Sequence, residues 1–412
     1  MLAKLIFVLL TLTLVQSREG YGPGDQDWGY VEVRPYANMF WWLHYTTADE
    51  VSTNRPLLIW IQGGPGASSS GEGNIYMSGL VDENLEPRDF SYVHLANMLY
   101  VDNPVGAGYS YVDVEKGGKF ATNMTELTSD YIALLQGFFK AHPEFEEVPL
   151  YLLGESFGGK FAPACAQRIH EEVAKGNLKA NLRGVGMAYP ATKLINNIAF
   201  MADELFHAGI VDSDGFKEIQ QRSNSILDAC IENRWVEAGD LLDELLDHVI
   251  ATYHLEFFSV TANSLNEFDL SELNSFMDEN VSPLLNISIP FGTQRDLVSK
   301  SLVDKLQPTS SSVEYLLNNT DIKIAIYNGQ LDWVVNTVGT YSWVMALNWY
   351  GDVAWNQVER KAFYWDGIHE GHCTEYDRLA FYWVKRAGHR LPNDNPNAMK
   401  YILKQLIGYQ PT

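Results

Sequence analysis

The pattern of hydrophobic and polar positions changes twice along the chain. In the N-terminal half, short runs that are almost continuously apolar alternate with a stretch of helical periodicity. Such runs are typical of strands that are covered on both faces in a parallel sheet. They occupy residues 55–62, 97–104, 148–156 and 182–190, and the helical stretch at 126–145 is stopped by Pro143. Strand–helix–strand order of this kind predicts a doubly wound α/β sheet.

After about Leu194 the pattern is different. Residues 199–254 have the periodicity of successive amphipathic helices, and a polar stretch rich in Asn and Ser continues through Ser312. Strand-like segments then return at residues 321–329, 361–367 and 379–389. The sequence therefore predicts one mostly parallel sheet that is interrupted by a mainly helical cap insertion at about residues 195–312.

The first 17 residues form a separate segment. Lys4 precedes a continuous apolar run from Leu5 to Val15, and Ser17 offers a small residue for cleavage. The run is short for a membrane span, which needs about 20 apolar residues, so we expect a signal peptide at 1–17 that is removed. A retained membrane anchor is the alternative. Cleavage would leave residues 18–412 as one α/β domain without a membrane anchor.

Four Asn-X-Ser/Thr sequons follow this segment. They place candidate glycosylation sites at Asn123, Asn280, Asn286 and Asn318. Sequons behind a signal peptide indicate passage through the secretory pathway, so we expect a secreted or lysosomal protein.

Composition and charge narrow the choice of partners. The chain has 412 residues, 46% of them hydrophobic, which is enough for a large core. Its formal net charge of −23 argues against nucleic acid as a partner, because phosphate binding needs a basic face. Three cysteines (Cys165, Cys230 and Cys373) allow at most one intramolecular disulfide. The stability of the fold must therefore come mainly from the core.

Residues 154–158, Gly-Glu-Ser-Phe-Gly, match the G-x-S-x-G pattern. In that pattern the serine lies on a strained turn between a strand and a helix, and the glycines prevent clashes. A strand-like run precedes Ser156, and a helical stretch follows it up to Gly176, with Pro163 expected in an early turn or at a kink. Ser156 is therefore the candidate nucleophile. The alternative is an ordinary serine in a glycine-rich loop.

A nucleophilic serine needs a base and a group that orients the base. In α/β-hydrolase folds the acid and then the histidine follow the serine, each after a later strand, and Asp332 and His389 occupy these places. The developing oxyanion needs N–H donors, for which the candidates are Gly64 and Phe157. Asp332 as a turn residue, and the glycine-rich loop as a plain Pro-Gly turn, are the alternatives.

Two other histidines lie close together in the sequence and could suggest a metal site. His369 and His372 are three residues apart, which is not the H-E-x-x-H spacing, and no nearby acid completes a ligand set. We therefore expect no metal site, and the sequence calls for no cofactor.

Several motifs, in one order along the chain, resemble those of the serine carboxypeptidases, and most closely the retinoid-inducible group. They are WIQGGPGASS at 60–69, VDNPVGAGYSYV at 101–112, GESFGGKFAP at 154–163, YNGQLDWVVNTVG at 327–339 and AGHRLPNDNP at 387–396. The resemblance covers nearly the whole mature chain and is weakest in the helical insertion. It implies an α/β-hydrolase fold and a serine-type hydrolase that removes C-terminal residues from peptides through an acyl-enzyme, usually at acidic pH.

The resemblance also implies roles for individual residues. Ser156, His389 and Asp332 correspond to the nucleophile, the general acid/base and the residue that orients the histidine, and Gly64 and Phe157 to the oxyanion hole. Gln62, Gly63 and Glu155 correspond to the residues that bind the terminal carboxylate of the substrate. A carboxyl group can donate a hydrogen bond to that carboxylate only when protonated, so such a pair favours acidic pH.

This sequence departs from the family pattern at several of these places. Gln62 stands where much of the family has Asn, Tyr76 where a glutamate often supports the Glu155 equivalent, and Arg390 where Met usually follows the histidine. We expect Arg390 and Tyr76 to border the leaving-group pocket, where Arg390 could attract an acidic residue or narrow the space. Ala67 and the segment GMAYPAT at 186–192 also differ, so substrate choice does not transfer from the family.

Three interpretations follow from these residues. The first is a serine carboxypeptidase acting on peptide or protein C-termini. The second is a carboxypeptidase-like protein that is catalytically weak or inactive and binds peptides or partners. The third is an acyltransferase that passes the acyl group to an acceptor other than water. The sequence leaves the oligomeric state open, a homodimer included.

Overall fold

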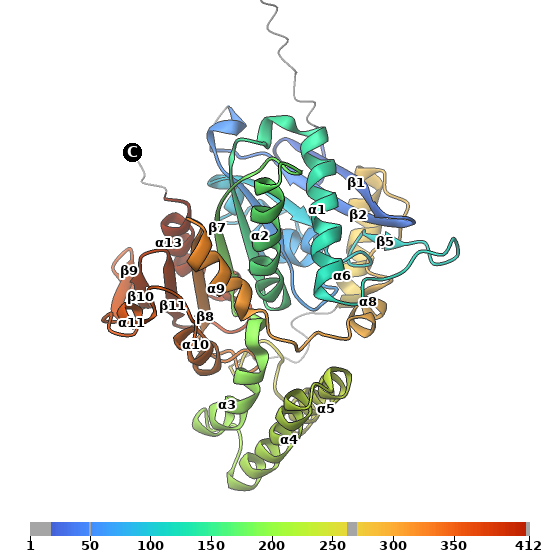
Figure 1. Cartoon of the computed structure of the whole chain (residues 1–412). Coiled ribbons are helices and arrows are strands. Elements are labelled where there is room, and N and C mark those ends of the chain that lie inside the picture. The colour runs from blue at the N-terminus through green and yellow to red at the C-terminus, as the bar shows by residue number, and fades with distance from the viewer. Residues whose placement is uncertain (1–17, 49–50, 262–269, 409–412) are drawn as a thin grey trace, which may run out of the picture.

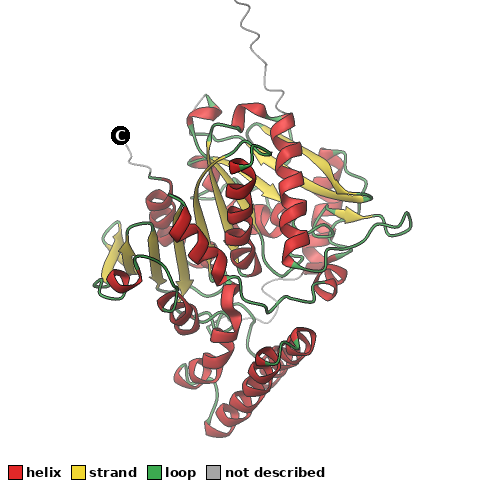
Figure 2. Ribbon diagram, in the orientation of Figure 1, coloured by secondary structure: helices red, strands yellow, loops and turns green. Residues whose placement is uncertain are grey.

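A computed structural model describes residues 18–48, 51–261 and 270–408 of the chain. The predicted signal peptide at 1–17 lies outside the described residues. An eleven-stranded sheet forms the centre, in the order β1-β2-β4-β3-β6-β7-β8-β11-β10-β9, with β5 paired to β2 (Figures 1 and 2). The strands are β1 (Gln26–Arg34), β2 (Ala37–His44), β3 (Leu57–Ile61), β4 (Asn97–Val101), β5 (Tyr111–Val112), β6 (Pro149–Glu155), β7 (Asn181–Ala188), β8 (Lys323–Gly329), β9 (Lys361–Trp365), β10 (Ile368–Tyr376) and β11 (Leu379–Val384).

The six strands in the middle of the sheet, from β4 to β11 in the spatial order, are parallel to one another. The flanking pairs β1–β2 and β9–β10 are antiparallel. This arrangement confirms the predicted mostly parallel α/β sheet, with helices on both faces. The sequence pattern did not predict β10, which contains His369 and His372 and pairs antiparallel with both β9 and β11.

Two hydrophobic cores lie on the two faces of the sheet, because successive side chains of a strand point in opposite directions. In β3, Leu57 and Ile59 belong to the core under α1 and α2, whereas Leu58 and Trp60 belong to the core on the other face. The helices outside the insertion are α1 (Met124–Ala141), α2 (Phe157–Ala174), α10 (Thr337–Met345), α11 (Asp352–Trp355), α12 (Leu391–Asp394) and α13 (Pro396–Ile407). Cys165, Cys230 and Cys373 are free thiols, which agrees with a fold stabilised by its core.

Between β7 and β8 the chain leaves the sheet and forms helices. Figure 1 shows α3, α4 and α5 projecting away from the sheet, with α3 packed on α4 and α4 on α5. The helices of this segment are α3 (Leu194–His207), α4 (Ser213–Ile231), α5 (Trp235–Tyr253), α6 (Leu270–Phe276), α7 (Ser282–Leu285), α8 (Arg295–Ser301) and α9 (Ser310–Asn319). The limits of the cap insertion at about 195 and 312 stay a prediction. No helix in the described ranges has the length and apolar character needed to cross a membrane.

Shorter helical turns connect these elements. They are the 3₁₀ turns at Ser52–Asn54, Tyr92–His94, Pro143–Phe145 and Ala191–Lys193, and the π-helices η2 (Ser69–Ser78) and η6 (Met277–Val281).

Pro163 lies inside α2 rather than at its first turn or at its end. A proline there cannot donate to the carbonyl of Gly159, four residues earlier. The Thr192 hydroxyl donates to that carbonyl instead, over 3.3 Å. The helix therefore continues past the proline and keeps its N-terminus at the end of β6.

Candidate active site

Ser156 lies on the sharp turn between β6 and α2, with backbone angles of φ 55° and ψ −115°. Non-glycine residues rarely adopt positive φ, so the turn is strained. Two glycines permit it: a Cβ on Gly154 would lie 2.2 Å from the Gly158 carbonyl oxygen, and a Cβ on Gly158 would lie 2.1 Å from that of Ile61. The Ser156 N–H donates to the Ala188 carbonyl over 3.0 Å, which fixes the turn against the end of β7.

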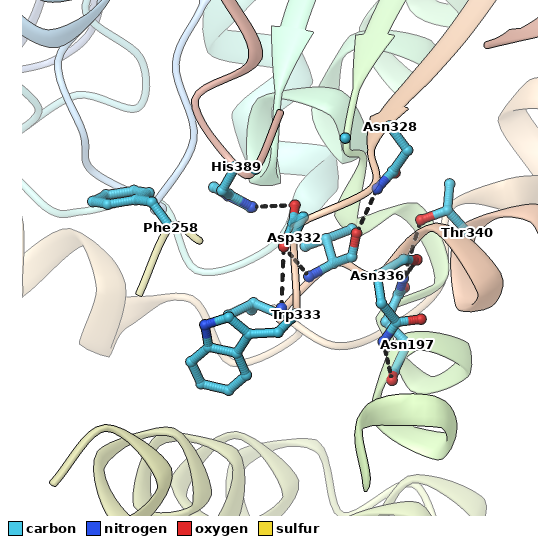
Figure 3. Close-up of polar contacts among 12 residues, drawn as sticks. Asn197, Phe258, Asn328, Asp332, Trp333, Asn336, Thr340 and His389 are labelled. Atoms are coloured by element: carbon cyan, nitrogen blue, oxygen red, sulfur yellow. Dashed lines mark hydrogen bonds and ion pairs between the residues drawn. The ribbon is translucent and has the colours of Figure 1, made fainter. Parts of the chain in front are cut away.

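Asp332 and His389 meet at the ends of two neighbouring strands, β8 and β11. His389 Nδ1 lies 2.7 Å from Asp332 Oδ2, and both side chains are buried (Figure 3). The other carboxylate oxygen, Oδ1, accepts hydrogen bonds from the N–H groups of Val334 (3.1 Å) and Val335 (2.9 Å). A carboxylate only accepts hydrogen bonds, so Nδ1 is the donor to Asp332, and Nε2 is the nitrogen that has the free lone pair in a neutral imidazole of this tautomer.

A network of amide side chains holds the Asp332 loop, and the sequence analysis missed it (Figure 3). Asn197, on α3, and Asn336 exchange hydrogen bonds between their side-chain amides and backbone carbonyls, each 2.8 Å long. Asn197 also donates to the Thr340 hydroxyl over 3.0 Å, and Asn328 donates to the Val335 carbonyl over 2.7 Å. Asn197 is 139 residues away from Asn336 in sequence, so no local pattern could have indicated the contact.

Ser156 and His389 line one cavity of about 600 Å³. Gln62, Gly63 and Glu155 line it as well, so the structure brings the predicted carboxylate-binding residues to the predicted nucleophile. The Gln62 side-chain amide donates to Glu155 Oε2 over 3.0 Å. Such an arrangement places a carboxyl group and an amide side by side at the wall of a cavity that also contains a nucleophile and a base.

The Glu155 side chain is only 3% exposed. Burial raises its pKa to about 7, although hydrogen bonds from Tyr189 and Gln62 and the nearby His389 act in the opposite direction. Glu155 is therefore protonated at acidic pH and can donate a hydrogen bond there.

The glycine-rich loop after β3 passes directly over the nucleophile. A Cβ on Gly63 would lie 2.8 Å from the Ser156 Cβ and 3.2 Å from the Phe157 backbone nitrogen, so only glycine fits. Gly64, the next residue, also lines the cavity. Phe157 is the first residue of α2, and the N–H groups of a first helical turn have no acceptor within the helix. The N-terminus of α2 thus favours negative charge beside Ser156.

Comparison with known proteins identifies the family. The sequence profile described as serine carboxypeptidase matches residues 19–408. This chain belongs to the serine carboxypeptidase family. It is accordingly a hydrolase, a serine-type carboxypeptidase, and the inactive and acyltransferase interpretations are not favoured.

Individual serine carboxypeptidases are similar over most of their length. The retinoid-inducible serine carboxypeptidase of Mus musculus is 32% identical, with 93% of this chain and 92% of that protein aligned. The venom serine carboxypeptidase of Apis mellifera is 30% identical over 87% of this chain and 79% of that protein. The solved structure of Kex1, a prohormone-processing carboxypeptidase from Saccharomyces cerevisiae, has a TM-score of 0.80 at 18% identity and covers 93% of this chain and 91% of that chain. That likeness supports the α/β-hydrolase fold.

The residues that depart from the serine carboxypeptidase pattern lie in different places. Arg390 lines the cavity, with its guanidinium carbon 4.0 Å from the centre of the Phe258 ring. Tyr76 is not among the described residues that line the cavity, although its carbonyl accepts a hydrogen bond from Asn393 over 2.7 Å. The sequence did not single out Glu72 and Arg295, which form an ion pair of 2.7 Å in the cavity wall.

The four sequons occupy two kinds of environment. Asn280, Asn286 and Asn318 are exposed, whereas Asn123 is half-buried and caps the N-terminus of α1. Within the described part of the chain, no three His, Cys, Asp or Glu side chains are grouped so that they could hold a metal ion. The rings of His369 and His372 instead contact each other, with their centres 4.8 Å apart.

Proposed function

We propose that this serine carboxypeptidase releases the C-terminal residue of peptides through an acyl-enzyme formed on Ser156. The observation that carries the proposal is the shared cavity, which combines Ser156 and His389 with the Gln62–Glu155 pair. A nucleophile and base alone would suit any ester or amide. A protonatable carboxyl group paired with an amide beside them suits a substrate with a free carboxylate.

Each residue then has a chemical role. Ser156 Oγ attacks the scissile carbonyl carbon while His389 Nε2 takes the hydroxyl proton. Asp332 holds the tautomer that leaves Nε2 free and stabilises the imidazolium that forms. The Gly64 and Phe157 N–H groups stabilise the oxyanion. His389 returns the proton to the leaving nitrogen, the C–N bond breaks, and water then hydrolyses the acyl-enzyme by the same steps.

The terminal carboxylate of the substrate would bind to Glu155, Gln62 and the Gly63 N–H. Glu155 can donate to that carboxylate only while it is protonated, which its pKa of about 7 permits at acidic and mildly acidic pH. Above that range two negative charges would face each other. Binding of C-terminal residues should therefore weaken as the pH rises through about 7.

The substrates and the cellular location are proposed from the family and from the sequence, not from the geometry of the site. The substrates are peptide or protein C-termini, as the family implies. Entry into the secretory pathway, followed by secretion or lysosomal delivery, is supported by the sequence of residues 1–17 and by the name of the venom relative. The side chains of Asn280, Asn286 and Asn318 are exposed and open to a glycan. Asn123 is half-buried, and its Nδ2, the atom to which a glycan would be attached, donates to the Thr122 hydroxyl over 3.1 Å, whereas its Oδ1 caps α1.

Labelling with a fluorophosphonate tests the catalytic part of this proposal. The purified protein should be labelled between about pH 4 and pH 7, because His389 activates Ser156. Ser156→Ala should abolish the labelling and serves as the control. Labelling that persists in Ser156→Ala, or wild-type protein that is not labelled at any pH in this range, would contradict the proposal.

A further inference from the structure

Tyr189 directly follows β7 and is held in an unusual backbone conformation. Its φ angle is 34°, a positive value that is rare for a non-glycine residue. The Tyr189 N–H donates to the Tyr327 carbonyl over 2.7 Å, and the side chain is 1% exposed. Strained residues of this kind persist only where the surroundings hold them, and they cluster at functional sites. Tyr189 also lines the active-site cavity.

The ring of Tyr189 lies against the catalytic histidine. The centres of the Tyr189 and His389 rings are 4.3 Å apart, with an angle of 40° between the planes. Phe257 and Phe258 flank the same imidazole at 5.8 and 5.9 Å. The imidazole therefore sits in an aromatic enclosure in which Tyr189 is its nearest ring, and the position of that ring limits how His389 can turn.

The hydroxyl of Tyr189 reaches the other half of the site. It lies near enough to the Glu155 carboxyl to oppose the rise in the Glu155 pKa that burial causes. Gln62 donates to Oε2 of Glu155, whereas Oε1 and the Tyr189 hydroxyl are both buried and have no hydrogen-bond partner of good geometry among the described groups. The two carboxyl oxygens of Glu155 thus have different neighbours, the amide on one side and the phenol on the other.

We infer that Tyr189 is a positioning residue that couples the two halves of the site: its ring holds His389 in place, and its buried hydroxyl serves the free oxygen of the Glu155 carboxyl group. The inference rests on the proposed function, because it assigns Glu155 to carboxylate binding. Tyr76 stands where the family often has a glutamate that supports the Glu155 equivalent, and it is not among the described residues that line the cavity. In this chain the support for Glu155 comes from the end of β7.

The direction of the hydroxyl's effect follows from its chemistry. Burial and the Glu155 charge both raise the pKa of Tyr189 well above its usual value, so the phenol remains a donor at every working pH. A donor stabilises the ionised carboxylate more than the neutral acid, and it therefore moves the ionisation of Glu155 to lower pH. Among the residues that the structure describes, His389 and Glu72 also act on Glu155, and Tyr92 and Tyr327 feel its charge.

The pH dependence of kcat/KM on a peptide with a free C-terminus tests this inference, because kcat/KM reports ionisations of the free enzyme. In Tyr189→Phe the ring remains and the donor is lost, so the alkaline limb should move up by about one pH unit. Tyr131→Phe is the matched control: it removes another buried hydroxyl that has no aligned partner and does not interact with Glu155, and it should leave the limb in place. Tyr189→Leu should also lower kcat about 10- to 100-fold below Tyr189→Phe, because the histidine loses its neighbouring ring.

A second variant tests the same effect in case Tyr189→Phe destabilises the fold. Site-specific 3-fluorotyrosine at position 189 retains the ring and is a stronger donor, so it should move the limb to lower pH. An alkaline limb that stays in place in both proteins would overturn the inference. Glu155→Gln separates this failure from that of the proposed function: if Glu155→Gln abolishes the limb while the Tyr189 variants leave it unmoved, only the role of Tyr189 is wrong.

Discussion

The side-chain amide of Gln62 donates to Glu155 Oε2 over 3.0 Å, and the Trp60 indole N–H donates to the side-chain oxygen of Gln62, Oε1, over 2.6 Å. An indole N–H is only a donor, so it fixes which end of the Gln62 amide faces Glu155. Hydrogen bonds thereby connect Trp60, in the core of the sheet, through Gln62 to Glu155, the residue before the nucleophile. The second N–H of the Gln62 amide can then serve a substrate carboxylate.

Gln62→Leu should weaken the binding of free C-termini. The lost hydrogen bond to a charged group is expected to raise KM about 10- to 100-fold for a peptide with a free C-terminus. The slow cleavage of the corresponding C-terminal amide should change little, because it has no carboxylate to bind. Steady-state kinetics on the peptide and its amide measure both effects. Trp60→Phe, which keeps Gln62 but frees its amide, should give a smaller increase, and equal losses on both substrates would contradict the assignment.

Glu155→Gln should remove the alkaline limb of kcat/KM near pH 7. Burial raises the pKa of Glu155 to about 7, so the wild-type side chain loses its donor proton as the pH rises through that value. An amide donates at every pH and has no such transition. Activity of Glu155→Gln at pH 8, relative to pH 5, should therefore exceed the wild-type ratio. A pH profile identical to that of the wild type would remove Glu155 from the account.

Asp332→Asn should lower kcat by about three to four orders of magnitude without unfolding the protein. An asparagine oxygen can still accept from the Val334 and Val335 N–H groups, but the carboxylate that selects the His389 tautomer is lost. Kinetics and circular dichroism measure the two properties separately. In a Ser156→Ala background the same substitution should cost little more activity, because residues that act as one unit are not additive. A further large loss there would show that Asp332 acts outside the triad.

A buried histidine outside the cavity lining, His142, should make the free energy of unfolding depend on pH. His142 Nε2 lies 3.1 Å from Asp27 Oδ2, and Nδ1 lies 3.0 Å from Glu144 Oε1. Burial acts to lower the pKa of His142, but the hydrogen bonds and charges of the two carboxylates outweigh it and raise the pKa to about 9. The stabilisation is therefore complete below the unfolded value of about 6.5 and is lost as the pH rises through about 9.

His142→Gln removes this charge and tests the effect. The free energy of unfolding should fall by about 2–3 kcal/mol at pH 6, and the difference from the wild type should shrink by pH 9.5. Urea unfolding at the two pH values measures it. A difference that is the same at both pH values would assign the loss to packing against Trp41 and Phe138, whose rings contact His142, rather than to its charge.

The features that the sequence predicts correctly are local ones. Strands β3, β4, β6, β7 and β8 are buried on both faces, so their apolar runs were visible, whereas β10 mixes polar and apolar residues near the sheet edge and gave no clear pattern. Ser156 carries its own motif, and Asp332 and His389 follow strands in the expected order. Asn197 and Tyr189 could not be found in this way, because their partners are brought to them only by the folded sheet and the insertion.

The products formed from one pair of peptides test the central claim most directly. A peptide and its C-terminal amide, otherwise identical, are incubated at about pH 5 with the wild-type protein and with Ser156→Ala, and the products are identified by mass spectrometry. The account predicts that the wild-type protein releases single residues from the C-terminus of the free peptide, cleaves the amide far more slowly, and that Ser156→Ala releases none. Equal cleavage of both peptides, internal cleavage, or activity that survives Ser156→Ala would contradict it.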